Sequence, residues 1–109
     1  MIDITVEKSG KSYTRLTLDG HADFASYGND IVCAAVSMLV INTINSIERF
    51  TDDAMQLDTD EENGFIDCAF PQGVSHDGSL LMDSAVMGLN ALADQYPDNI
   101  SMNLKEEKQ

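Results

Sequence analysis

Apolar and polar residues alternate at the start of the chain, first over residues 2–6 and again over residues 13–18. Alternation of this kind is typical of β-strands that bury one face. The connection over residues 8–11 has hairpin length and contains Gly10, which can adopt a positive φ. We therefore expect the chain to begin with a β-hairpin.

From residue 31 to residue 50 the apolar residues recur at steps of three and four, as they do along one face of an α-helix. A helix of this length has about five turns. Its first half, residues 31–41, is apolar on almost every side, which favours burial on more than one face. Either the core alone or the core together with a second subunit would bury these residues.

A second hairpin and a second helix follow in the sequence. Residues 55–60 and 65–70 alternate on either side of Asn63-Gly64, and an Asn-Gly pair in this position is a strong hairpin signal. Residues 77–96 again show the helical period, so we expect a second helix there.

Pro97 ends the second helical pattern, and alternation returns over residues 100–104. The charged residues 105–109 follow, and we expect them to form a frayed tail. The predicted order is ββαββαβ, an α+β fold with two helices and a mostly antiparallel sheet.

Composition and charge narrow the classes of function. The 109 residues, 43% of them hydrophobic, predict one domain over residues 1–109 with a modest core that a homodimer would help to stabilise. The formal charge of −13 opposes direct binding to nucleic acid or to anionic membranes and favours a basic partner. We find no leader segment and no apolar stretch of about 18 residues, and therefore expect a cytoplasmic protein.

The two cysteines show no CxxC motif and no histidine at metal-ligand spacing, so we expect no disulfide, no metal and no cofactor. Cys68 shares a strand face with Ile66 and Phe70, and we expect it to be a buried thiol of the core. Cys33, in contrast, stands at the opening of the first predicted helix.

A cysteine in the first turn of a helix is a candidate nucleophile, because unpaired N–H groups and the helix dipole stabilise a thiolate there. His21 precedes Cys33 across a short glycine-bounded segment and is the candidate base. Asp30 is the expected N-cap, although it can also orient His21. Ser37, one turn after Cys33, either orients a side chain or satisfies a backbone carbonyl. His76 is a rival base, but its neighbours fit a capped helix start more simply.

The segment between the histidine and the cysteine suits a substrate-gating loop, or serves as a plain connection. Backbone N–H groups of Gly28 and Asn29, at the start of the helix, can hold a developing oxyanion. The residues of the expected loop are Ala22, Asp23, Phe24, Ala25, Ser26 and Tyr27.

The stretch Gly20-His21-Ala22, together with Gly28 and residues 30–37, closely resembles the ribosomal-processing cysteine protease (Prp) family of bacteria. The resemblance covers essentially the whole chain. It implies that Cys33 and His21 form a catalytic dyad and that the enzyme acts as a homodimer. The substrate it implies is a large-subunit ribosomal protein, bL27, made with an N-terminal extension that must be removed.

Acidic residues gather around the second hairpin, where they either steer a basic ribosomal protein to the site or form a solvated surface that blunts a strand edge. Two other functions remain open. A non-catalytic acidic module that binds a basic ribosomal partner would keep its function in Cys33→Ala, whereas a redox-sensing thiol would need Cys33 but not His21. The acidic residues are Asp52, Asp53, Asp58, Asp60, Glu61 and Glu62.

Overall fold

The computed structural model describes residues 1–20 and 27–107, and for residues 27–30 it describes the backbone alone. These residues form two helices and a five-stranded sheet in the predicted order ββαββαβ. The elements are β1 (Ile2–Ser9), β2 (Ser12–Asp19), α1 (Tyr27–Phe50), β3 (Gln56–Asp60), β4 (Phe65–Ala69), α2 (His76–Gln95) and β5 (Ile100–Glu107).

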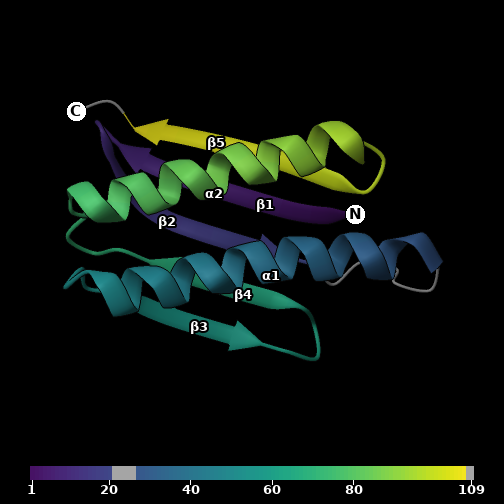
Figure 1. Ribbon diagram of the computed structural model, residues 1–109, viewed down its shortest axis with the longest axis horizontal. Helices are drawn as coiled ribbons and strands as arrows, with labels where there is room; N and C mark the ends of the chain where they lie inside the picture. Colours follow the sequence, from purple (N-terminus) through teal and green to yellow (C-terminus); the bar gives the residue numbers. More distant parts are fainter. Residues whose placement is uncertain (21–26, 108–109) are drawn as a thin grey trace.

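The strands lie in the order β3-β4-β2-β1-β5. Each neighbouring pair is antiparallel except β1 and β5, which run parallel, so the prediction of a mostly antiparallel sheet is confirmed. Both helices cover the same face of this sheet and run in opposite directions (Figure 1). As a result, the start of α1 and the start of α2 lie at opposite ends of the molecule.

Both predicted hairpins are confirmed, and each turns at a glycine with positive φ. Gly10, between β1 and β2, and Gly64, between β3 and β4, both have a φ of 63°. Glycine adopts this conformation without the steric cost that a Cβ atom brings. A Cβ on Gly64 would also lie 3.3 Å from the backbone of Gly20.

The core lies between the sheet and the helices, and it contains alternating residues of β1 and β2, one residue each of β4 and β5, and one stripe of each helix. The buried stripe of α1 follows steps of four and three, which is the predicted helical period. The most deeply buried members are Ile4, Val6, Leu16, Val32, Val36, Val40, Ile47, Cys68, Phe70, Met82 and Leu89.

The C-terminal strand is longer than predicted. Residues Lys105, Glu106 and Glu107, expected to belong to a frayed tail, pair with the end of β1 and complete β5. The N–H of Gly10 also donates to the carbonyl of Glu107 over 3.0 Å. A parallel ladder satisfies backbone groups whatever side chains they carry, so the charged composition did not end the strand.

Helix α1 contradicts the expectation that no apolar stretch reaches about 18 residues. Ile31–Phe50 is a 20-residue helical stretch with a mean hydropathy of 1.6, long and apolar enough to cross a membrane by length and composition. A helix of a protein core meets the same criteria. In this structure the buried stripe of α1 packs against the sheet.

Candidate active site

Cys33 lies in the second turn of α1, one turn before Ser37. Its side chain is half-buried and packs against the edge of the core. The Cys33 Sγ atom lies 3.9 Å from Ser37 Oγ, at the outer limit of a weak hydrogen bond that involves sulfur. The prediction that these two side chains share one face of the helix is therefore confirmed.

The predicted start of α1 is wrong by about one turn. The helix begins at Tyr27, so Asp30 lies inside its first turn and is not the residue that caps it. Cys33 falls beyond the first turn, where the field of the helix dipole has weakened. The sequence predicts the start at the first periodic apolar residue, since Gly28 and Asn29 are poor helix formers. The structure continues the helix through both.

This correction also limits which backbone groups can stabilise an oxyanion. The N–H groups at the start of a helix have no partner within it, and in α1 those of Gly28 and Asn29 belong to this first turn. The N–H group of Cys33 itself is engaged in the helix. Gly28 and Asn29 therefore remain candidate donors, whereas Cys33 does not.

Several predicted site residues lie outside the part of the chain that the structure describes. This holds for His21 and for Ala22, Asp23, Phe24, Ala25 and Ser26, and also for the side chains of Tyr27 and Asp30. The dyad and the gating loop consequently stay predictions. What the structure does define is the residue at which the chain enters this segment.

Gly20 fixes that entry point at the β3–β4 turn. It is buried, and its N–H donates to the carbonyl of Gly64 over 2.9 Å. The described part of the chain before residue 21 therefore ends beside this turn.

Cys68 behaves as predicted, as a buried thiol of the core. Its side chain has no exposed surface. Burial raises the pKa of the Cys68 thiol to about 11, and the negative charge of Asp67 adds to this effect. The two cysteines therefore differ sharply, because Cys33 is accessible in part and Cys68 is not.

His76 lies far from Cys33 and serves the start of α2. Its ring is almost fully exposed, and Nδ1 lies 3.2 Å from a carboxylate oxygen of Asp77. Ser75 precedes it as the N-cap, with its hydroxyl accepting a hydrogen bond from the N–H of Gly78. Since α1 and α2 start at opposite ends of the molecule, His76 is not the partner of Cys33 (Figure 1).

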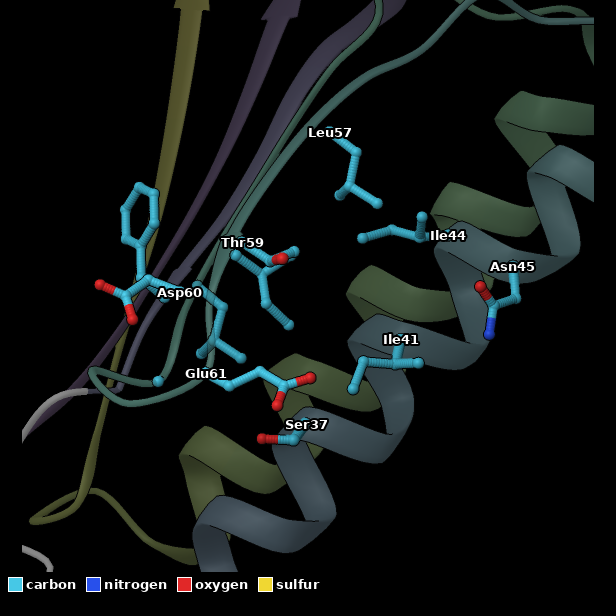
Figure 2. Close-up of a pocket in the computed structure, with 12 residues that line it drawn as sticks. Ser37, Ile41, Ile44, Asn45, Leu57, Thr59, Asp60 and Glu61 are labelled. Carbon is cyan, nitrogen blue, oxygen red and sulfur yellow. The ribbon is translucent and has the colours of Figure 1, made fainter.

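A pocket of about 360 Å³ opens between α1 and the β3–β4 hairpin, beginning at Ser37 (Figure 2). Its apolar side chains come from the helix and from three strands, while polar groups stand at its rim. The lining residues are Leu18, Ser37, Ile41, Ile44, Asn45, Leu57, Thr59, Asp60, Glu61, Gly64, Phe65 and Ile66.

Glu61 and Ser37 point toward each other across one end of this pocket, whereas Asp60 points away from α1 (Figure 2). From the sequence, Glu61 is predicted only to belong to a general acidic surface. The pocket itself was not predicted, because it forms where α1 and the hairpin that follows it face each other, and no periodic pattern specifies how two elements pack. The exposed Leu57, in a strand with acidic neighbours, was the available signal.

The other acidic residues near the second hairpin have different roles. Asp53 accepts hydrogen bonds from the backbone N–H and the hydroxyl of Ser75, so it supports the start of α2. Asp58 and Glu62 are exposed on the hairpin. Within residues 1–20 and 27–107, no group of three or more histidine, cysteine or acidic side chains is arranged to hold a metal ion.

Solved structures of other proteins share this arrangement. A crystal structure from Streptococcus mutans superposes with a TM-score of 0.88 at 29% identity, covering 98% of this chain and 96% of that one. The ribosomal processing protease Prp of Staphylococcus aureus, solved in complex with a substrate peptide, gives a TM-score of 0.88 at 25% identity. That match covers 96% of this chain and 100% of the other.

The sequence relatives agree with the structural ones. The chain is 31% identical over 104 residues to the ribosomal processing cysteine protease Prp of Staphylococcus aureus, covering 95% of this chain and 97% of the relative. It is 35% identical over 101 residues to the Mycoplasma pneumoniae protein of the same name, covering 93% and 92%. Residues 1–101 match the family described as cysteine protease Prp. With the fold, the half-buried thiol and these relatives in agreement, the chain belongs to the cysteine protease Prp family.

Proposed function

We propose that this protein is an endopeptidase that removes the N-terminal extension of the ribosomal protein bL27 through a dyad of Cys33 and His21. The observation that carries the proposal is the position of Cys33, which is half-buried on α1 one turn from the residue that opens the pocket. Relatives named ribosomal processing proteases support the choice of substrate.

The entry point of residues 21–26 supports the pairing of the dyad. Gly20 is held against Gly64, and Gly64 lines the same pocket as Ser37. Gly20, the residue before His21, therefore lies beside a turn that lines the pocket, which supports the pairing. A proton transfer between the two side chains needs contact within about 3 Å, and this can be reached once substrate is bound.

The chemistry follows from these roles. His21 takes the thiol proton of Cys33, and the resulting thiolate attacks the scissile carbonyl carbon. The N–H groups of Gly28 and Asn29 stabilise the oxyanion that forms. His21 then gives its proton to the leaving amine, and a water molecule hydrolyses the thioester to release the acid and restore the thiol. Asp30, no longer assigned to the helix cap, orients His21 in this scheme.

The proposal includes the gating loop over residues 22–27 and a homodimer. Ile31 and Met38 on α1 are 61% and 68% exposed, and apolar side chains of this size at the surface favour a contact with a second copy. Light scattering should give twice the mass of one chain, and Met38→Glu should lower it. A monomeric mass for the unmodified protein would refute the dimer. We place the enzyme in the cytoplasm, where cell fractionation should recover it.

The test of activity is incubation with recombinant bL27 precursor, followed by mass spectrometry. We expect one cleaved bond with the unmodified chain and none with Cys33→Ala or His21→Ala. Cleavage that survives Cys33→Ala would refute the nucleophile. Binding without cleavage would favour an acidic binding module, and reversible oxidation of Cys33 without cleavage would favour a redox sensor.

A further inference from the structure

We propose that Asn63, in the β3–β4 turn, is a site of spontaneous deamidation, and that the isoaspartate formed there lowers peptidase activity by displacing Gly20. The modification itself does not depend on what the protein does, whereas its effect on activity rests on the proposed function. It needs no enzyme and no reagent other than water.

The nucleophile of this reaction is the backbone nitrogen of Gly64. It attacks the side-chain Cγ carbon of Asn63 and forms the C–N bond of a cyclic succinimide, while the amide nitrogen leaves as ammonia with the N–H proton of Gly64. Water then opens the ring at one of its two carbonyl carbons. Attack at the side-chain carbonyl gives aspartate, and attack at the main-chain carbonyl gives isoaspartate, in which the backbone continues through the side chain.

The sequence marks Asn63 as the most reactive asparagine of the chain. It is the only one followed by glycine, which has no Cβ atom to hinder the approach of its nitrogen to the preceding side chain. Asn45 and Asn90 are also exposed, but they lie inside helices, where the next N–H group is engaged in the helix. Asn103 lies in β5, and its side-chain amide donates to a backbone carbonyl of β1 over 3.2 Å.

The turn around Asn63 is exposed and loosely held. The backbone nitrogen of Gly64 lies 3.3 Å from the carbonyl oxygen of Glu61, and that of Asn63 lies 3.4 Å from Asp60 Oδ1. Both distances exceed the usual length of a hydrogen bond from an N–H group. Exposed, weakly bonded segments open locally at a low cost in free energy, and opening frees the Gly64 nitrogen for attack.

The two products perturb the turn in different ways. Aspartate keeps the path of the backbone. It loses the 2.6 Å hydrogen bond from Asn63 Nδ2 to Asp60 Oδ2 and adds a negative charge beside Asp60, Glu61 and Glu62. These carboxylates are exposed, so solvent screens their repulsion. Isoaspartate also inserts one extra atom into the backbone before Gly64.

The inserted atom affects Gly20 because the two glycines are in backbone contact. The carbonyl of Gly64 accepts the N–H of Gly20 over 2.9 Å, and a Cβ on Gly64 would lie 3.3 Å from the Gly20 backbone. When a longer turn shifts Gly64, this hydrogen bond breaks or Gly20 moves with it. Gly20 directly precedes His21, and the turn lies at the end of the molecule where α1 begins (Figure 1). We therefore expect isoaspartate, more than aspartate, to lower activity.

Ageing of the purified protein in mildly alkaline buffer tests the inference. Peptide mapping by mass spectrometry gives the fractions of aspartate and isoaspartate at each asparagine, with electron-transfer fragmentation to distinguish the two products. The same samples are assayed for cleavage of the precursor and for Tm. Asn63→Gln is the matched control, since it keeps an amide in the turn but forms a cyclic imide far more slowly. Freshly purified Asn63→Asp carries the added charge on an unchanged backbone.

We expect deamidation at Asn63 before any at Asn45 or Asn90. Activity of the unmodified chain should fall about threefold to tenfold as isoaspartate becomes the main form, because small displacements at an active site slow the reaction. Its Tm should fall over the same period. Aged Asn63→Gln should keep its initial activity and Tm, and fresh Asn63→Gln and Asn63→Asp should start within about twofold of the unmodified activity.

The possible outcomes separate the modification site, its effect and the proposed function. No mass change at Asn63, or equal deamidation at Asn45 or Asn90, would refute the site. Isoaspartate at Asn63 without loss of activity, or an equal loss in Asn63→Gln, would refute the effect through Gly20. A fresh unmodified chain that never cleaves the precursor would refute the peptidase, while the peptide maps would still decide whether Asn63 is the site.

Discussion

Alkylation by iodoacetamide should distinguish the two thiols of the native protein, and the structure gives the size of the difference. The thiolate is the reactive form of cysteine. With a pKa of about 11, Cys68 has about one thousandth of its thiol ionised at pH 8. An ordinary cysteine with a pKa of about 8.5 has about a quarter ionised. Its low ionisation alone therefore slows the alkylation of Cys68 by about two orders of magnitude relative to an ordinary cysteine.

Burial of the side chain slows the alkylation of Cys68 further. Its side chain has no exposed surface, so the reagent reaches it only when the strand opens. For a domain with about 5 kcal/mol of stability, the open fraction is of the order of 10⁻⁴. Cys33 is half-buried and needs no such opening. We expect complete modification of Cys33 before any detectable modification of Cys68.

The assay follows both cysteine-containing peptides by mass spectrometry after quenching at intervals. In guanidinium chloride, where the fold is lost, the two cysteines should react at similar rates, which provides the control. Loss of peptidase activity should follow the modification of Cys33. Modification of Cys68 at a rate comparable to Cys33 in the native protein would refute the burial and the raised pKa together.

The raised pKa of Cys68 also predicts the sign of a pH effect on stability. Above about pH 9 the thiol ionises in the unfolded chain but remains protonated in the folded protein. The folded state then binds more protons, so stability falls as the pH rises from about 9 through 11. Cys68→Ala should reduce this slope, as measured by urea unfolding at several pH values, and an unchanged slope would contradict the raised pKa.

Further predictions concern the scaffold and the charge. Tyr13→Phe removes the hydrogen bond that the tyrosine hydroxyl donates to Asp83 over 2.5 Å. The loss should lower the free energy of unfolding, measured in urea, by about 1 kcal/mol. An unchanged unfolding midpoint would contradict this prediction. Gly78→Ala places a Cβ in steric conflict with the carboxylate of Asp53, so it should lower Tm despite the better helix propensity of alanine. A higher Tm would show that Asp53 moves freely. Gly64→Ala should lower the free energy of unfolding by about 1–2 kcal/mol, because it strains a positive φ and crowds Gly20. It should also lower peptidase activity. Unaltered activity would show that this turn does not contribute to the active site. Raising the salt concentration should slow association with a basic substrate, and an unchanged association rate would refute electrostatic steering.

The fold was predictable because the local signals agree with the tertiary structure. The period of the apolar residues distinguishes helix from strand in every segment, and glycines mark both hairpin turns at the positions that need positive φ. Two errors in element bounds arise where local composition and backbone pairing disagree. Charged residues 105–107 looked unsuited to a strand, and Gly28 and Asn29 looked unsuited to a helix, yet both segments continue regular structure because neighbouring backbone groups accept their hydrogen bonds.

The candidate site was predictable only where residues close in sequence define it. Cys33 and Ser37 follow from the helical period alone. The pocket joins α1 to a hairpin that begins after the helix has ended, so no periodic pattern contains it.

Glu61 shows most clearly what the sequence leaves undetermined, because its neighbours Asp60 and Glu62 carry the same charge in the same turn. Figure 2 shows that Asp60 points away from α1 and Glu61 toward it, a difference set by the geometry of the turn and by the register of β3 on β4. Three carboxylates that are equivalent in sequence thus acquire different surroundings in space. An acidic run therefore predicts a long-range field, whereas the surroundings of each carboxylate depend on the turn and on the strand register.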